Sequence, residues 1–278
     1  MNSGLSLYIG ESLSPGCLAC KRGTWLCIFV TERCNLNCIF CPQLRPKFEI
    51  SLEQPEDIEE SLLINSTLCY DIHCFEYALS LKKEQIDGIS YSGGEPFLVI
   101  PKIIKLAEKC NSLGKGIYQW IYTNGLLVTE DSLKQLRDLN IVEIRFNWAA
   151  THFNEIIFKN MELAGKYMKK VVVEIPMYHP RVLDILPKLK TLADIGVSQI
   201  NCAELYINEE NRQRLNIPEA EVYKYPEYGE LSPYWSRLLT YDLMFYVQEQ
   251  GIKITVNDCS NDAKTVQKLS RAANVMNL

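Results

Sequence analysis

The sequence has no apolar run near the roughly 18 residues that a membrane-spanning helix needs. Its first 16 residues contain neither the basic nor the apolar segment of a secretory signal. The sequence also lacks an excess of positive charge, because 29 Lys and Arg stand against 34 Asp and Glu and the formal net charge is −5 at pH 7. A large nucleic-acid footprint needs a basic face, so this balance disfavours one. We expect a cytoplasmic protein that binds neither a membrane nor nucleic acid.

Histidine is rare, whereas cysteine is abundant. The three histidines do not cluster, and surface or core positions explain them best. There are 11 cysteines, and six of them lie between residues 17 and 41. The cytosol keeps thiols reduced, so a disulfide framework is disfavoured and clustered cysteines indicate metal or redox chemistry. Cys69, Cys74 and Cys110 lie in expected helices and are interpreted as buried free thiols.

Short β-branched runs alternate with helical stretches, which predicts βαβ units and a parallel sheet. The expected strands are 24–31, 86–92, 116–123, 141–148, 171–178 and 197–205. The expected helices are 55–82, 101–113, 129–139, 153–167 and 182–194. Right-handed crossovers allow an open doubly wound sheet or a full or partial barrel, and periodicity alone does not separate them.

Three parts of the chain differ in pattern. Residues 1–23 are an N-terminal segment with a C-x2-C pair, residues 24–207 carry the strand–helix repeat, and residues 208–278 form an extension. The extension has a polar Tyr- and Pro-rich stretch, then an expected helix at 234–250 and a short strand at 252–256. We expect it to cover one end of the sheet.

Cys34, Cys38 and Cys41 follow the first expected strand with the spacing C-x3-C-x2-C. Thiolates bind zinc, copper(I) and iron–sulfur clusters. A structural zinc site is closed by four ligands, whereas three cysteines in one loop leave a position open. A cubic iron–sulfur cluster with three cysteine ligands would keep one iron free for a small chelating molecule.

This motif, with Phe40 before its last cysteine, resembles the signature of the radical S-adenosylmethionine (SAM) enzymes. The resemblance covers about residues 24–205. It implies an α/β fold, a partial (β/α)6 TIM-type barrel with parallel strands. It also implies a [4Fe–4S] cluster whose free iron binds SAM and cleaves it to a 5′-deoxyadenosyl radical that abstracts hydrogen from a substrate. The alternative interpretation of the three cysteines is a zinc loop or incidental thiols.

The resemblance extends to two further strand ends. "SGGEP" resembles the segment that meets the methionine amino group of SAM, which implies roles for Gly93, Gly94, Glu95 and Pro96. "YTNG" resembles the polar strand end of pyruvate formate-lyase activating enzyme, which implicates Thr123 and Asn124. Tight turns explain both segments in the absence of a ligand. Because parallel strands place their carboxyl ends at one edge, all three motifs should meet there.

Charged and amide side chains inside apolar strands extend the predicted SAM or substrate site. Arg145 and Asn147 share one face of their strand, and Arg145 needs an anionic partner. That partner is the SAM carboxylate or a buried acid. Two acids and one amide complete the prediction: Glu174, Asn201 and Glu204. They would meet SAM or substrate, or pair with Arg145 structurally.

Other cysteines suggest further chemistry. Cys17 and Cys20 form a pair that, with distant thiols, could hold iron or zinc as a second metal site. The extension lacks the cysteine runs of an auxiliary-cluster domain. Cys202 and Cys259 are candidates for hydrogen-atom donors to a substrate radical. Segments around these cysteines resemble mostly archaeal radical SAM proteins related to pyruvate formate-lyase activating enzyme.

The resulting hypothesis is an anaerobic radical SAM enzyme acting on a peptide or protein side chain. Biosynthesis of a small metabolite or cofactor is the next alternative, and radical methylation follows because no cobalamin motif is present. The acidic balance disfavours tRNA modification. The resemblance implies a reducing partner such as flavodoxin or ferredoxin. A non-catalytic iron–sulfur or zinc protein is the hypothesis from another class.

Overall fold

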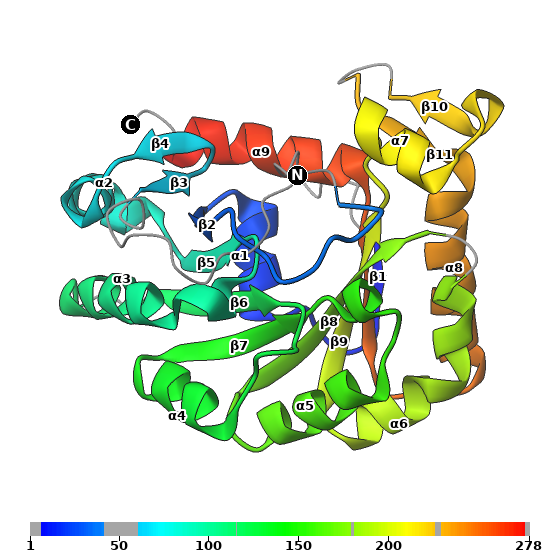
Figure 1. Cartoon of the computed structure of the whole chain (residues 1–278), viewed down its shortest axis with the longest axis horizontal. Helices are drawn as coiled ribbons and strands as arrows, with labels where there is room; N and C mark the ends of the chain where they lie inside the picture. The colour runs from blue at the N-terminus through cyan, green and yellow to red at the C-terminus, as the bar shows by residue number, and fades with distance from the viewer. Residues whose placement is uncertain (1–6, 42–60, 115, 179–180, 226–228, 276–278) are drawn as a thin grey trace.

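The computed structural model describes residues 7–41, 61–114, 116–178, 181–225 and 229–275. Six parallel strands form its centre and lie side by side in chain order (Figure 1). They are β2 (Trp25–Thr31), β5 (Gly88–Gly93), β6 (Tyr118–Thr123), β7 (Ile141–Phe146), β8 (Lys170–Met177) and β9 (Val197–Glu204). All six coincide with the strands expected from the sequence, and the predicted mostly parallel α/β sheet is confirmed.

Further strands extend both edges of this sheet. β12 (Thr255–Cys259) pairs in parallel with β9, and β1 (Tyr8–Ile9) pairs antiparallel with β12. At the other edge, β3 (Leu62–Ile64) pairs antiparallel with β2. β3 also pairs with β4 (Thr67–Cys69). Within the described residues the two edges do not pair, so the curved sheet is a partial barrel rather than a closed one.

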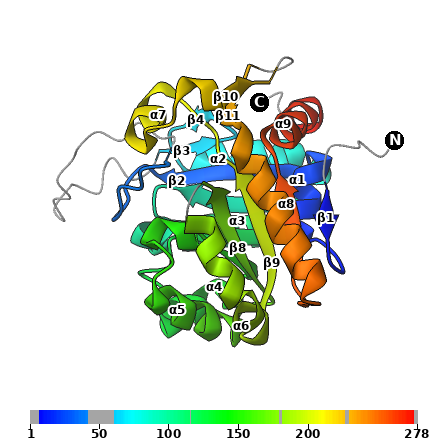
Figure 2. The same ribbon diagram turned by 90° about the vertical axis from the view of Figure 1, so that its right-hand side faces the viewer.

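Helices cover the outer face of the sheet (Figures 1 and 2). They are α3 (Ile100–Ser112), α4 (Glu130–Asp138), α5 (Glu155–Gly165), α6 (Leu189–Asp194) and α8 (Tyr234–Glu249). Buried residues such as Ile103, Leu133 and Leu243 pack there against strand residues such as Ile121 and share one large core with them. Burial of this apolar surface is the main force that holds the helices on the sheet.

The inner, concave face of the sheet is covered by an N-terminal helix. Its floor is occupied by α1 (Pro15–Arg22), which Ser14 caps through its side chain. α1 packs so closely on the sheet that a Cβ at Gly16 would lie 2.7 Å from an Arg145 nitrogen and 3.1 Å from the Trp120 ring. Ala19, Trp25 and Trp120 form a small separate apolar cluster on this face. α9 (Asn261–Val275) lies beside α1 (Figure 1).

The expected helix at 55–82 is wrong in its described part. The helix α2 covers only Ile72–Lys82, and the β3–β4 hairpin precedes it. Asn65 and Ser66 form the turn with φ values of 51° and 75°. Two consecutive positive φ angles are typical of the tight hairpin turn that matches strand twist. Residues 55–60 lie outside the described part of the chain.

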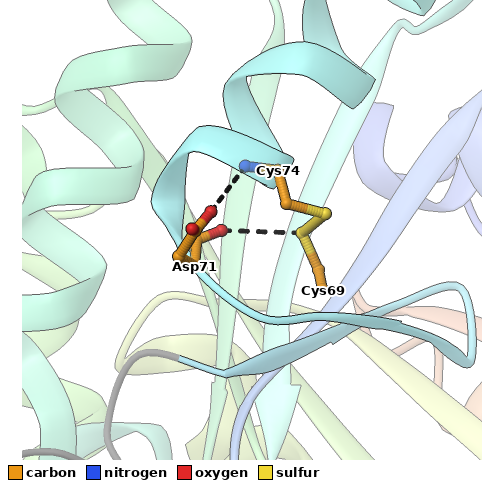
Figure 3. Close-up of a disulfide and its surroundings, with 3 residues drawn as sticks. All are labelled: Cys69, Asp71 and Cys74. Atoms are coloured by element: carbon orange, nitrogen blue, oxygen red, sulfur yellow. Dashed lines mark hydrogen bonds between the residues drawn. A yellow bond between two sulfur atoms is a disulfide. The ribbon is translucent and has the colours of Figure 1, made fainter.

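Cys69 and Cys74 are not free thiols in a helix, as the sequence had suggested, but form a disulfide (Figure 3). Their Cα atoms are 5.6 Å apart, which is within the usual disulfide range. The bond links the end of β4 to the first turn of α2. Asp71 caps this helix by accepting a hydrogen bond from the Cys74 amide at 2.8 Å.

One expected helix and one expected strand have different bounds in the structure. The segment 182–194 begins as a 3-10 helix, Arg181–Lys188, which contains Pro187, and only Leu189–Asp194 is α-helical. The expected strand at 252–256 lies later, at Thr255–Cys259, and is part of the main sheet.

The tail also contains α7 (Glu209–Leu215) and the hairpin of β10 (Val222–Lys224) and β11 (Leu231–Pro233). The division at residues 23 and 207 stays a prediction. In the described residues no helix is long and apolar enough to cross a bilayer.

Candidate functional site at the carboxyl edge of the sheet

The cysteine loop leaves β2 at the carboxyl edge of the sheet, with Cys34, Cys38 and Cys41 half-buried. Cys38 Sγ donates to the Ala150 carbonyl at 3.7 Å, and Cys34 Sγ lies 3.9 Å from Asn35 Oδ1. No three His, Cys, Asp or Glu side chains of the described ranges stand together as a preformed metal site. Cluster binding would therefore require the three thiols to turn toward one another.

Contacts from later parts of the chain hold the backbone of this loop. The ring of Phe40 is buried and lies 5.1 Å from the Tyr178 ring, just beyond the end of β8. From α7, Asn211 Nδ2 donates to Phe40 O at 3.4 Å and Arg214 donates to Cys38 O at 2.6 Å. Phe40 thus anchors the loop, and the role at the cofactor that the sequence resemblance implies for it stays a prediction.

Gly93 and Gly94 bring the next strand end against the cysteine loop. Gly94 N donates to Thr31 O at 2.7 Å and Glu95 N donates to Arg33 O at 2.7 Å. Gly93 has φ +122°, and a Cβ at Gly94 would lie 1.9 Å from Arg33 O. No other residue type permits this approach. The two glycines and the loop therefore form one backbone unit.

Glu95 joins the second strand end to the third. Its carboxylate is 1% exposed. It accepts hydrogen bonds from Phe97 N at 3.0 Å, Thr123 Oγ1 at 2.8 Å and Asn124 N at 2.7 Å. Pro96 begins the 3-10 helix Pro96–Val99 and is also buried. Because these donors occupy both oxygens of Glu95, the parts of "SGGEP" left open to a ligand are the partly exposed Ser92, Gly93 and Gly94.

Asn124 forms the turn considered for it, whereas its predicted contact with SAM stays a prediction. Its Oδ1 accepts from Leu126 N at 3.0 Å and so forms the turn. Its Nδ2 donates to Asn35 Oδ1 at 2.7 Å, which ties the turn to the cysteine loop. Thr123 supports the same turn by accepting from Gly125 N at 2.9 Å. Asn35 was missed by the sequence analysis because a lone polar loop residue carries no pattern.

The fourth strand end continues this edge. Asn147 follows β7 directly, and its backbone N donates to Thr123 O at 2.8 Å. Its side-chain Oδ1 accepts from Ala150 N at 3.2 Å. Asn147 is half-buried, and the Ala150 carbonyl is the one that Cys38 contacts. The sheet thus brings Asn147 to the edge occupied by the three predicted motifs.

Arg145 lies deeper and is paired with acids. Its side chain is 3% exposed and lies 2.6 Å from Glu143 and 3.5 Å from Glu174. Burial opposes its charge, but Cys17, Glu143 and Glu174 raise the pKa of the guanidinium well above its usual value. Of the two partners considered, the structure provides carboxylates, of which Glu143 is fully buried.

Glu174 and Asn201 belong to the same polar layer on the concave face. Asn201 Nδ2 donates to Glu174 Oε2 at 3.2 Å, and Asn201 Oδ1 accepts from Gln199 at 2.6 Å. Asn201 is fully buried, whereas the Glu174 side chain is 27% exposed. Glu174 is therefore the member of this layer that a ligand in the concavity can reach.

Glu204 is hydrogen-bonded to residues of the C-terminal extension. Its carboxylate is 1% exposed and accepts hydrogen bonds from Tyr223, from Tyr225 at 2.8 Å and from Asn261 N at 2.7 Å. Burial, together with the bond to Glu204, raises the pKa of both tyrosines. Glu204 thus ties β10 and the start of α9 to the end of β9.

The remaining cysteines divide between the two faces of the sheet. Cys202 is fully buried on the outer face, in the large core. Burial raises the pKa of its thiol. It is not brought near the other predicted site residues. Cys259, Cys17 and Cys20 all lie on the concave face, where Cys259 and Cys20 are half-buried and Cys17 is buried.

Comparison with known proteins gives partial matches. No protein-family model matches the chain. A Methanocaldococcus jannaschii protein named as a glycyl-radical enzyme activating enzyme is 27% identical over 213 residues, or 74% of this chain and 53% of that protein. A Methanothermobacter marburgensis protein named as a GTP 3′,8-cyclase is 36% identical over 124 residues, 44% of this chain and 33% of that protein. The chain spans about half the length of the first curated relative.

The fold resembles solved structures of Streptococcus suis SuiB. SuiB bound to S-adenosylmethionine matches with a TM-score of 0.54 at 14% identity, over 86% of this chain and 50% of SuiB. SuiB bound to its precursor peptide SuiA matches with a TM-score of 0.55 at 15% identity, over 86% of this chain and 48% of SuiB. These likenesses confirm the predicted barrel-type fold.

Proposed function

We propose that this chain, whose relatives and fold support membership of the radical SAM superfamily, binds a [4Fe–4S] cluster through Cys34, Cys38 and Cys41. The carrying observation is the meeting of the cysteine loop, "GGEP" and "TNG" at one sheet edge through direct hydrogen bonds. Three thiols on one short loop suit such a cluster and leave one iron for SAM. When bound, the cluster supplies the electron that cleaves SAM reductively.

The chain's own residues position and shield this chemistry. Phe40 and α7 fix the loop backbone, and Glu95 locks two strand ends together. The partly exposed Gly93, Gly94 and Asn147 line the same edge and are proposed to contact SAM. Thr123 and Asn124 are 3% and 6% exposed, so we propose that they shape the site from beneath.

We propose a peptide or protein side chain as the substrate. The support is the name of the methanogen relative, an activating enzyme, and the solved complex of SuiB with its precursor peptide. The abstracted hydrogen would come from a group held in the concavity near Glu174. Cys259 donates a hydrogen atom there only as a free thiol, so this proposed role and metal ligation by Cys259 exclude each other. The proposed reductant is a flavodoxin- or ferredoxin-type protein. The acidic net charge supports the exclusion of nucleic acid.

A small-molecule substrate is the second candidate. The relative named as a GTP 3′,8-cyclase favours it, since 36% identity over 124 residues is the highest identity among these matches. We also propose that Cys17 and Cys20 serve a second metal site.

The test is anaerobic reconstitution with iron and sulfide, followed by SAM and a strong reductant and quantification of 5′-deoxyadenosine. We expect formation of 5′-deoxyadenosine that is lost in Cys38→Ala and kept in Cys110→Ala, a buried cysteine in α3. Formation that survives in Cys38→Ala without a cluster would refute the proposal. Addition of peptides or nucleotides then separates the two substrate classes by the stimulation that each produces.

A further inference from the structure

Three thiols from distant parts of the chain meet on the concave face. Cys17 and Cys20 lie three residues apart on α1 and so share one side of that helix. Cys259 ends β12, which pairs with β9. The sheet and α1 thus bring together residues from near the two ends of the sequence, in a layer below the cysteine loop.

A short path of contacts joins two of these thiols. Cys17 Sγ lies 3.5 Å from Asn201 Oδ1. Asn257 Nδ2 lies 3.0 Å from the same Asn201 oxygen and 3.0 Å from Cys259 Sγ. Cys20 interacts electrostatically with both Cys17 and Cys259. Cys17 and Cys259 therefore share one neighbourhood around the Asn201–Asn257 pair. Cys20 lies about one helical turn from Cys17, and its Sγ donates to Gln267 Oε1 of α9 at 3.1 Å.

Three N–H donors and two amide oxygens contact these sulfurs, the oxygens being Asn201 Oδ1 at Cys17 and Gln267 Oε1 at Cys20. Cys17 Sγ accepts from Gln199 Nε2 at 3.1 Å and from Arg145 at 3.4 Å, and Cys259 Sγ accepts from Asn257 at 3.0 Å. Donors aimed at sulfur stabilise metal-bound thiolates and tune their centres. Purely apolar packing of a buried cysteine would not need them.

The main alternative is a reactive thiol pair. A reactive cysteine needs a thiolate near neutral pH. Here burial raises the pKa of the Cys20 thiol to about 12, and burial raises that of Cys259 as well. The placement of the three sulfurs, rather than thiol reactivity, is therefore what indicates a metal.

We propose that Cys17, Cys20 and Cys259 together bind one thiophilic metal centre, with its fourth position on the side of Glu174. Glu174 interacts electrostatically with both Cys20 and Cys259 and is the partly exposed carboxylate of this layer. The proposal completes the second metal site of the proposed function and rests on it for location, but it requires no SAM cleavage. The centre is a zinc ion or an iron–sulfur cluster, since both take thiolates.

Ligation requires the thiols to turn from their amide partners toward one another, because they do not stand as a preformed site in the described residues. The separation of Cys17 and Cys20 on α1 suits ligation of one metal. Residues three apart on a helix have Cβ atoms about 5–6 Å apart. Zinc–sulfur bonds of about 2.3 Å can bridge such a pair.

The test uses the full chain with Cys34, Cys38 and Cys41 replaced by alanine, so that the cysteine loop cannot bind metal. Co²⁺ is titrated anaerobically, and thiolate-to-metal charge-transfer absorption is recorded. We expect saturation at one Co²⁺ per chain and displacement by Zn²⁺. Adding Cys17→Ser, Cys20→Ser and Cys259→Ser should abolish the absorption, whereas adding Cys110→Ser should leave it unchanged. Asn257→Ala should weaken binding about tenfold through its lost hydrogen bond.

Circular dichroism is recorded to establish that each variant is folded. The proposal is overturned if the folded triple variant shows no thiolate absorption, or if the absorption survives the three added serines. Metal analysis and electron paramagnetic resonance of the triple variant after iron–sulfide reconstitution distinguish zinc from a cluster. Because this background cannot cleave SAM, a negative result here leaves the radical chemistry untouched. Loss of 5′-deoxyadenosine in the assay of the intact chain likewise leaves this site untouched.

Discussion

Replacing Glu95 with alanine would remove the acceptor that joins two strand ends beneath the cysteine loop. Its carboxylate accepts from Phe97 N, Thr123 Oγ1 and Asn124 N within 3.0 Å, at 1% exposure. A buried donor left without an acceptor costs about 1–3 kcal/mol. Since water can enter the space and such costs are not additive, we expect about 3–6 kcal/mol of lost unfolding free energy for the three donors.

Glu95→Gln is the sharper variant. It keeps one oxygen but sets an amide N–H₂ against one of the backbone or hydroxyl donors, so we expect a loss of about 1–3 kcal/mol. Urea denaturation followed by circular dichroism measures both variants, and a shift of midpoint at constant slope reports stability alone. The exposed Glu84→Gln serves as the control and should match the unmodified chain. A loss below about 1 kcal/mol for Glu95→Ala would refute the idea that this carboxylate locks the edge.

Four further predictions follow from the fold. Gly94→Ala should lower iron incorporation strongly, because its Cβ would lie 1.9 Å from a loop carbonyl; normal iron content per chain would contradict this. Removing the Cys69–Cys74 disulfide should cost about 2 kcal/mol for so short a loop, and a reductant should destabilise only the unmodified chain. Arg145→Met should cost about 3–5 kcal/mol in a denaturant titration, since it removes the cation beside the fully buried Glu143; a neutral effect would contradict this. Burial raises the pKa of Tyr225 in the folded chain, so on raising the pH the unfolded chain loses this proton first, near pH 10. The free energy of unfolding should therefore fall as the pH rises above 10. In Tyr225→Phe this fall should be smaller.

The six central strands could be predicted because β-branched runs separated by helical stretches and turn residues are local signals. The rule that ligands meet at the carboxyl ends of parallel strands then placed the cysteine loop, Gly94 and Asn124 at one edge. The structure joins them by direct hydrogen bonds. Topology and motif together were therefore sufficient for the position of the site.

Side-chain partners were not predictable in the same way. Glu95 and Glu204 look available in the sequence, but each accepts hydrogen bonds from remote residues. Thr123 lies 28 residues from Glu95, and Asn261 lies 57 residues from Glu204. The hairpin before α2 was missed because Asn65 and Ser66 lack the glycine of the commonest tight turns. Such contacts depend on which remote segments pack together, and local periodicity carries no information about that.

The position of α1 inside the concave face has a consequence for the order of folding. α1 is held by groups on β7 and β9 and lies beside α9, so its docking closes a loop of most of the chain. During synthesis the six central strands and their outer helices can assemble first, while α1 still lacks β12 and α9 as neighbours. Contacts of such large sequence separation form slowly. The concave face would then remain open to solvent until α9 has been synthesised, which gives metal and cofactors a period of free access before α1 is fixed in place.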